Sequence, residues 1–181
     1  RWKMLALIAE CLVELNQENG LKGELSVYSL VDPGESARAA LNKPPFSCFK
    51  GALNTEELTK VKSGADVLVH VEAFDRTNRD ITRLSISTKI PEYMASGRCI
   101  LAVGPDDVAS MEYLIEYDLG VVATSCDKKD IKQAVRNVMT DSGKRMDYAQ
   151  RGLLMADKRH DAEKVAAAMV ELISNAAAEK S

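Results

Sequence analysis

Apolar side chains recur at helical spacing from the first residues of the chain. Trp2, Leu5, Ile8 and Leu12 fall on one face of a helix with 3.6 residues per turn. The pattern ends at Gly20, a residue type that commonly follows a helix. We therefore expect a long helix that begins almost at residue 1.

The rest of the chain alternates between short apolar runs and helical segments. Strands are predicted at residues 24–31, 46–49, 65–71, 99–104 and 120–124. Helices are predicted at residues 32–41, 54–64, 87–98 and 106–120, and from residue 127 onward with breaks near Gly143 and Arg159. Residues 72–87 are polar and lack a clear period, and we expect a long loop there, mobile at residues 75–80.

This alternation predicts the fold class. Strands and helices in turn favour an α/β protein, a doubly wound Rossmann-like parallel sheet with helices on both faces. The simplest account is one domain over residues 1–181, with a terminal helix over residues 158–181. Because the chain opens within a helix and without an initiator Met, we expect it to be the C-terminal fragment of a longer protein.

Composition narrows the function classes. The 46% apolar and 28% charged shares are typical of a globular protein, and a net charge of −3 makes nucleic acid an unexpected partner. No apolar run reaches the roughly 18 residues of a membrane span. The cysteines are scattered and form no C-x-x-C pair, so we expect reduced, buried thiols in a cytoplasmic protein; they are Cys11, Cys48, Cys99 and Cys126.

The stretch "STKIPEYMASGR" (residues 87–98) carries candidate chemistry. Ligands of doubly wound sheets bind beyond the carboxyl ends of the strands, where helix N-termini favour phosphate. Ser87 and Thr88 add hydroxyl groups and Lys89 adds a positive charge, while Glu92 could accept hydrogen bonds from a sugar diol. The residues thus suggest a nucleotide site. Alternatively, the hydroxyls only cap a helix and Lys89 and Glu92 form a solvated ion pair.

Several stretches, in order, resemble the C-terminal, donor-binding half of GT-B glycosyltransferases, especially the retaining family-4-type enzymes (glycosyl transferases group 1). They are "FKGALNTEEL", "GADVLVHVEAF", "STKIPEYMASGRCILAVGP" and "YDLGVVAT". With the opening helix and strand, the resemblance covers nearly the whole chain. It implies binding of a nucleotide-diphosphate sugar and, in the full-length enzyme, transfer of a hexose-type sugar to a glycan or lipid-linked acceptor, as in polysaccharide biosynthesis.

The resemblance also implies roles for matching positions. Glu92 matches the glutamate that holds the donor ribose hydroxyls, and Lys89 matches a position that faces the donor diphosphate. Ser87 and Thr88 match the turn that borders the phosphates. Phe49 matches a residue near the end of the second strand, where the nucleobase packs.

One departure concerns the sugar. The family pattern has two glutamates separated by seven residues, and the earlier position is Leu84 here. The sugar and the stereochemical course are therefore left open. The resemblance implies a reaction without metal or cofactor, and the sequence has no D-x-D motif. Catalytic residues stay unassigned and are expected in an upstream GT-B domain, through which peripheral membrane association would occur. We expect the isolated chain to be inactive.

Other readings follow from other motifs. A nicotinamide or flavin Rossmann domain would need G-x-G-x-x-G, and the chain contains no G-x-G. A nucleotide-sugar epimerase half of GT-B architecture and a non-enzymatic flavodoxin-like regulatory module remain as alternatives.

Isolated polar residues carry weaker expectations. We expect His70 to be a core histidine with a local partner and His160 to cap a terminal helix. Asp106 and Asp107 are expected to cap the following helix, with contact to the donor sugar as the alternative.

Overall fold

Parallel strands form two small sheets in the computed structural model, which describes residues 1–178. In one sheet β1 (Leu25–Tyr28) pairs with β2 (Ser47–Gly51). The other sheet has the order β3–β4–β5, and all of its strands are parallel. Its members are β3 (Val67–Val71), β4 (Cys99–Val103) and β5 (Gly120–Ala123).

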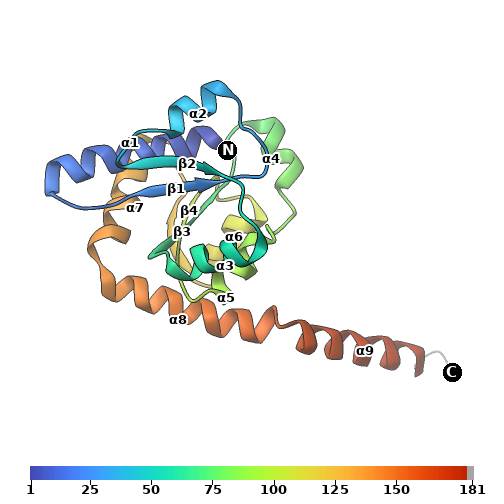
Figure 1. Ribbon diagram of the computed structural model, residues 1–181. Helices are drawn as coiled ribbons and strands as arrows, with labels where there is room; N and C mark the ends of the chain where they lie inside the picture. The colour runs from blue at the N-terminus through green and yellow to red at the C-terminus, as the bar shows by residue number, and fades with distance from the viewer. Residues whose placement is uncertain (179–181) are drawn as a thin grey trace.

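Helices connect the strands and cover them on both sides (Figure 1). Those that precede β4 are α1 (Trp2–Asn19), α2 (Glu35–Leu41), α3 (Thr55–Gly64), α4 (Arg76–Thr82) and α5 (Lys89–Ala95). Those that follow β4 are α6 (Ala109–Glu116), α7 (Lys128–Thr140), α8 (Ser142–Arg159) and α9 (Ala162–Ala178). The long opening helix is thus confirmed.

The central strand β4 separates two hydrophobic cores. All five of its residues are buried. Alternate side chains of a strand point to opposite faces, so burial of every residue means that both faces are covered. Leu101 and Val103 pack in the core beneath α1 and α7, whereas Ile100 and Ala102 pack in the core beneath α5, α6 and α8. The prediction of an α/β fold with helices on both faces of parallel strands is therefore confirmed.

Close packing at the start of β5 requires a glycine. A Cβ atom built on Gly120 would lie 2.4 Å from the backbone oxygen of Ile100 in β4. No side chain fits at that distance, so Gly120 allows β5 to approach β4 closely enough for the ladder to form.

The predicted loop over residues 72–87 is wrong in its middle, where α4 forms. Asp75 is the N-cap residue of α4, and its carboxylate accepts a hydrogen bond from the Asn78 N–H at 3.1 Å. The helix buries none of its residues, so its sequence shows no apolar stripe and periodicity could not reveal it. Residues 75–80 therefore begin a capped helix.

The expected caps on α6 and α9 are also wrong. Helix α6 begins at Ala109, whose N–H donates to the Arg83 carbonyl at 2.8 Å, while Asp107 forms an ion pair with Arg79. His160 ends α8 instead of starting α9, and Asp161 accepts the Lys164 N–H. The start of α6 depends on contacts with residues distant in sequence, which a local signal does not report, whereas Asp161 caps α9 through a local contact that the sequence analysis assigned to its neighbour His160.

Two smaller differences concern helix breaks and thiols. The break expected near Gly143 falls at Asp141, so Gly143 lies within α8. The terminal helix predicted over residues 158–181 is divided between α8 and α9. Residues 179–181 of that prediction lie outside the described part of the chain. Cys11 and Cys99 are buried as expected, but Cys48 is half-buried and Cys126 is exposed. Within residues 1–178, no helix combines the length and apolarity that a membrane crossing requires.

Candidate functional site

The first turn of α5 presents the predicted phosphate-binding residues to solvent. Thr88 is its N-cap residue and makes no side-chain capping hydrogen bond, and both Thr88 and Lys89 are exposed. The Lys89 N–H points to Ser87 Oγ at 3.4 Å, and the Ile90 N–H donates to the Ser87 carbonyl at 3.0 Å. Pro91 has no N–H. The amides of Lys89 and Ile90 are therefore already engaged by Ser87, and the Lys89 ammonium group is the full positive charge at this turn.

The segment that precedes α5 is held against α6. The Ser87 N–H donates to the hydroxyl of buried Ser110 at 2.9 Å, and that hydroxyl donates in turn to the Ser85 carbonyl at 3.3 Å. Ser87 is therefore half-buried and fixed in place by α6. Its own hydroxyl is used by the Lys89 N–H, which makes Thr88 the more available hydroxyl group of the pair.

Glu92 has a partner that sequence reasoning missed. Lys62 Nζ, in the last turn of α3, lies 2.8 Å from Glu92 Oε2. The Lys62 side chain is 18% exposed and that of Glu92 is 53% exposed, so the carboxylate keeps an open side. Arg98 donates to the Ser63 carbonyl next along α3 and fixes the same helix end. The only sequence signal for Lys62 was a basic residue at a helix C-terminus, which is common.

Phe49 lies on the other sheet, in β2. The guanidinium carbon of Arg38, from α2, lies 5.2 Å from the centroid of the Phe49 ring, which is a cation–π contact. The Phe49 N–H donates to Asn42 Oδ1 at 2.7 Å. The structure thus brings Ser87, Thr88, Lys89 and Glu92 together on one turn, whereas Phe49 lies on a separate element with partners of its own.

A buried ionisable cluster lies where β3 ends. His70 Nε2 lies 3.1 Å from Glu72 Oε1, and Glu72 Oε2 lies 2.8 Å from the Arg1 guanidinium group. His70 is 4% and Glu72 1% exposed, so the prediction that His70 is a core histidine with a local partner is confirmed. Burial opposes ionisation of Glu72, but the hydrogen bond from His70 and the charge of Arg1 outweigh it, so the pKa of Glu72 is lowered.

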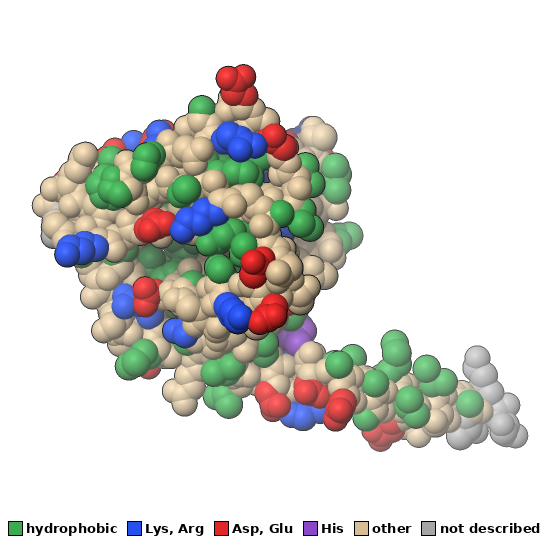
Figure 2. All heavy atoms as spheres, in the orientation of Figure 1, with side chains coloured by type: hydrophobic (Ala, Val, Ile, Leu, Met, Phe, Trp, Pro, Cys, Tyr) green, Lys and Arg blue, Asp and Glu red, His purple; other side chains and the backbone are tan. Residues whose placement is uncertain are grey.

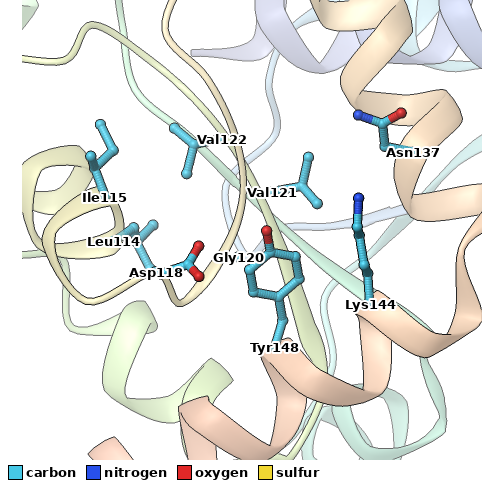
Figure 3. A pocket seen from close by; sticks show the side chains of 9 residues that line it. All are labelled: Leu114, Ile115, Asp118, Gly120, Val121, Val122, Asn137, Lys144 and Tyr148. Atoms are coloured by element: carbon cyan, nitrogen blue, oxygen red, sulfur yellow. The ribbon is translucent and has the colours of Figure 1, made fainter.

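Two shallow pockets follow the free edge of β5. The first has a volume of about 310 Å³ and lies at the amino end of the strand; Figure 3 shows Lys144 and Asn137 on one side of it and Leu114 on the other. The second, of about 290 Å³, shares Val121 and Asn137 with the first. None of the five predicted donor-site residues lines either pocket, so those residues occupy a different part of the surface.

The described residues were also compared with the requirements of a metal site. Among residues 1–178, no group of three or more His, Cys, Asp or Glu side chains is arranged to hold a metal ion.

The fold of this chain is GT-B glycosyltransferase-like. It is similar to the crystal structure of WaaG, a glycosyltransferase involved in lipopolysaccharide biosynthesis, with a TM-score of 0.53 and 17% sequence identity. The similarity covers 82% of this chain and 47% of the WaaG chain, so the chain spans about half the length of that protein. No family model matches the sequence, and no curated protein matches it either. At this identity the similarity concerns the fold alone.

Proposed function

We propose that this chain is the C-terminal, donor-binding half of a family-4-type glycosyltransferase, and that the first turn of α5 binds a nucleotide-diphosphate sugar. The observation that carries the proposal is the open turn on a GT-B-like fold: Lys89 and Glu92 are both exposed there, and Lys62 fixes the carboxylate. A cation such as Lys89 would bind phosphate, and a carboxylate such as Glu92 would accept hydrogen bonds from sugar hydroxyl groups.

Lys89 acts on the diphosphate. When the sugar is transferred, the nucleoside diphosphate leaves with increased negative charge, and a positioned ammonium group stabilises that charge as it develops. Because the amides of Lys89 and Ile90 are already hydrogen-bonded to Ser87, removal of the Lys89 side chain would remove the full positive charge at this turn. Thr88 adds a hydroxyl donor to a phosphate oxygen.

Glu92 acts on the ribose. Its Oε2 is engaged by Lys62, which leaves Oε1 as the acceptor for a ribose hydroxyl group. The pairing also keeps the carboxylate in one orientation, so less rotational freedom is lost when the donor binds. Phe49, with Arg38 over its ring, supplies an apolar surface for the nucleobase.

The remaining parts of the reaction lie outside these residues. The acceptor site and the catalytic groups are assigned to an upstream GT-B domain, in keeping with the half-length match to WaaG. The donor domain contributes binding and charge stabilisation and needs neither metal nor cofactor in this scheme.

Calorimetry and thermal shift with UDP, GDP, ADP and their sugars test the proposal. One nucleoside diphosphate class should bind and stabilise the chain, and Lys89→Ala and Glu92→Ala should each weaken that binding. Lys60→Ala is the matched control, because Lys60 belongs to an exposed ion pair with Glu56 on α3. If no diphosphate binds at millimolar concentration, or if the control loses as much affinity as Lys89→Ala, the proposed site is wrong.

A further inference from the structure

Residues 79–87, which connect α4 to α5, lie along the start of α6 and are here called the strap. At its outer end, Arg79 forms an ion pair with Asp107. Further along, the Arg83 carbonyl accepts a hydrogen bond from the Ala109 N–H at 2.8 Å. The contacts follow in the same order on both segments, so the strap and the start of α6 run side by side.

The inner end of the strap is held by one buried hydroxyl group. Ser110 is 0% exposed, and its hydroxyl accepts the Ser87 N–H at 2.9 Å and donates to the Ser85 carbonyl at 3.3 Å. Because a hydroxyl group both donates and accepts, one side chain satisfies both backbone groups. The Ile90 N–H donates to the Ser87 carbonyl at 3.0 Å, so Ser110 is connected to the first turn of α5 through a single residue.

Apolar packing does not hold the strap. Helix α4, which contains its outer end, buries none of its residues, and Ile81 and Leu84 are 74% and 93% exposed. Segments with few buried apolar contacts open locally at a low cost in free energy. The position of the strap, and of the turn with Thr88 and Lys89 that follows it, therefore depends on its polar contacts with α6.

The ion pair at the outer end differs from an ordinary surface pair. Figure 2 shows acidic and basic side chains beside one another over the body of the molecule, and an exposed pair of that kind contributes little stability. The Asp107 side chain is only 32% exposed, and its Oδ1 is buried and makes no hydrogen bond within residues 1–178. Arg79, which contacts Oδ2, therefore compensates the charge of a largely enclosed carboxylate.

We propose that the strap positions the donor site, with Asp107 and Ser110 as its two positioning residues. The inference rests on the proposed function, because the turn that the strap positions is the one that carries Lys89. When the strap is docked on α6, Thr88 and Lys89 are held where a diphosphate meets them. When the strap is released, the turn moves with it and the affinity falls. By linkage, a bound diphosphate favours the docked strap to the same extent.

Amide hydrogen exchange, followed by NMR on the chain without ligand, tests whether the strap docks as a unit. Ser110→Ala removes the buried hydroxyl, and Asp107→Ala removes the ion pair at the far end of the strap. Each should speed exchange of the Ile90 amide about fivefold or more, although neither removes the bond from that amide to the Ser87 carbonyl. Unchanged exchange of the Ile90 amide in both variants overturns the proposal.

Two matched controls separate this effect from a general loss of stability. Ser47→Ala removes another hydroxyl that is 0% exposed, which donates to a carbonyl group at 2.6 Å and lies in the other sheet. Asp157→Ala removes an ion pair with Lys164 between α8 and α9. Neither control should speed exchange of the Ile90 amide. Equal acceleration in the controls would contradict the proposal.

Calorimetry with UDP, GDP and ADP tests whether docking of the strap matters to the donor. For the diphosphate that the wild-type chain binds best, Ser110→Ala and Asp107→Ala should each weaken binding about three- to tenfold. Removal of a negative charge by itself would strengthen the binding of an anion, so weaker binding by Asp107→Ala reports position and not charge. These probes carry no sugar, so direct contact of Asp107 with a sugar does not enter. Asp157→Ala should not weaken binding.

The reciprocal effect is measured by exchange in the presence of the same diphosphate. It should slow exchange of the Ala109 amide, which is bonded to the Arg83 carbonyl and lies outside the proposed donor site. The same ligand should slow it less in Ser110→Ala, because the strap is then held at fewer points.

The outcomes separate this inference from the proposed function. Weaker diphosphate binding in Lys89→Ala, with unchanged binding in Ser110→Ala and Asp107→Ala, would leave the donor site standing and overturn the role of the strap. If no diphosphate binds the wild-type chain, the donor site is wrong and the positioning role is overturned with it. The exchange of the Ile90 amide would still show whether the strap docks as a unit.

Discussion

Lys62 Nζ lies 2.8 Å from Glu92 Oε2 and joins the last turn of α3 to the first turn of α5. The two residues are thirty positions apart in the sequence. The lysine is the more enclosed of the two, and it leaves the carboxylate open to solvent on its other side. Lys62 is therefore a positioning residue for the proposed donor site.

Replacement of Lys62 by Met should weaken binding of the preferred nucleoside diphosphate by about two- to fivefold, the worth of a partly exposed ion pair. The reason is that the Glu92 carboxylate loses its fixed orientation. Calorimetry measures the change. Lys62→Arg should retain the affinity, and Lys60→Met should not alter it. Unchanged affinity in Lys62→Met, together with a loss in Glu92→Ala, would refute the positioning role but not the site.

Glu72→Gln should make the free energy of unfolding less dependent on pH. Because the pKa of folded Glu72 lies below its usual value of 4.5, its ionised form stabilises the fold above that value, and this contribution is lost as the pH falls through the folded pKa. At pH 7 we expect the substitution to cost about 1–3 kcal/mol in free energy of unfolding, and the difference from wild type to shrink below pH 4. Urea denaturation at several pH values measures this.

Asp80→Asn is the control for this titration, since Asp80 is exposed and pairs with Arg76 at 3.7 Å. It should change the stability little at any pH. A Glu72→Gln difference that stays constant down to pH 3 would show that the charge of Glu72 does not stabilise the fold.

Gly120→Ala should destabilise the fold by about 1–3 kcal/mol or more, because the added methyl group would overlap the Ile100 carbonyl in the centre of the sheet. Gly64→Ala is the matched control: a Cβ there meets nothing within 4 Å, and the site is helical. We expect Gly64→Ala to raise the stability by about 0.4–1 kcal/mol. Thermal and urea unfolding compare the two, and equal effects would contradict the packing at β5.

The thiols should react in a fixed order. Burial raises the pKa of Cys11 and of Cys99 to about 11 from 9.0, which lowers their thiolate content about 100-fold at a given pH. Cys126 is exposed. Iodoacetamide at pH 8 should therefore modify Cys126 well before Cys11 or Cys99, as followed by peptide mass spectrometry. Cys126→Ser should remove the fast phase, and fast labelling of Cys99 in the folded protein would refute its burial.

The sheet could be predicted because its strands carry their own signal. Residues 99–104 are almost wholly apolar, as expected of a strand covered on both faces, and β4 is buried throughout. Helix α3 likewise has a local start signal, and the capping box between Asn54 and Glu57 is present. Helix α4 has a capping aspartate but no apolar stripe, because none of its residues is buried. Hydrophobic periodicity therefore could not predict it.

The candidate site likewise has residues that the sequence could group and a residue that only the structure adds. Ser87, Thr88, Lys89 and Glu92 could be grouped from sequence because one helix turn holds neighbours together. Lys62 could not be added to them, because its approach to Glu92 depends on how α3 packs beside α5.

The sequence by itself determined the alternation of strands and helices and the two-faced burial of the sheet, since both follow from the spacing of apolar residues over short distances. Tertiary structure alone decided the partners of the charged residues: Lys62 with Glu92, Arg1 with Glu72, and Arg79 with Asp107. A charged side chain has no preferred partner in the extended chain. Its partner is set by which elements the apolar core brings within about 4 Å, and those elements are distant in sequence.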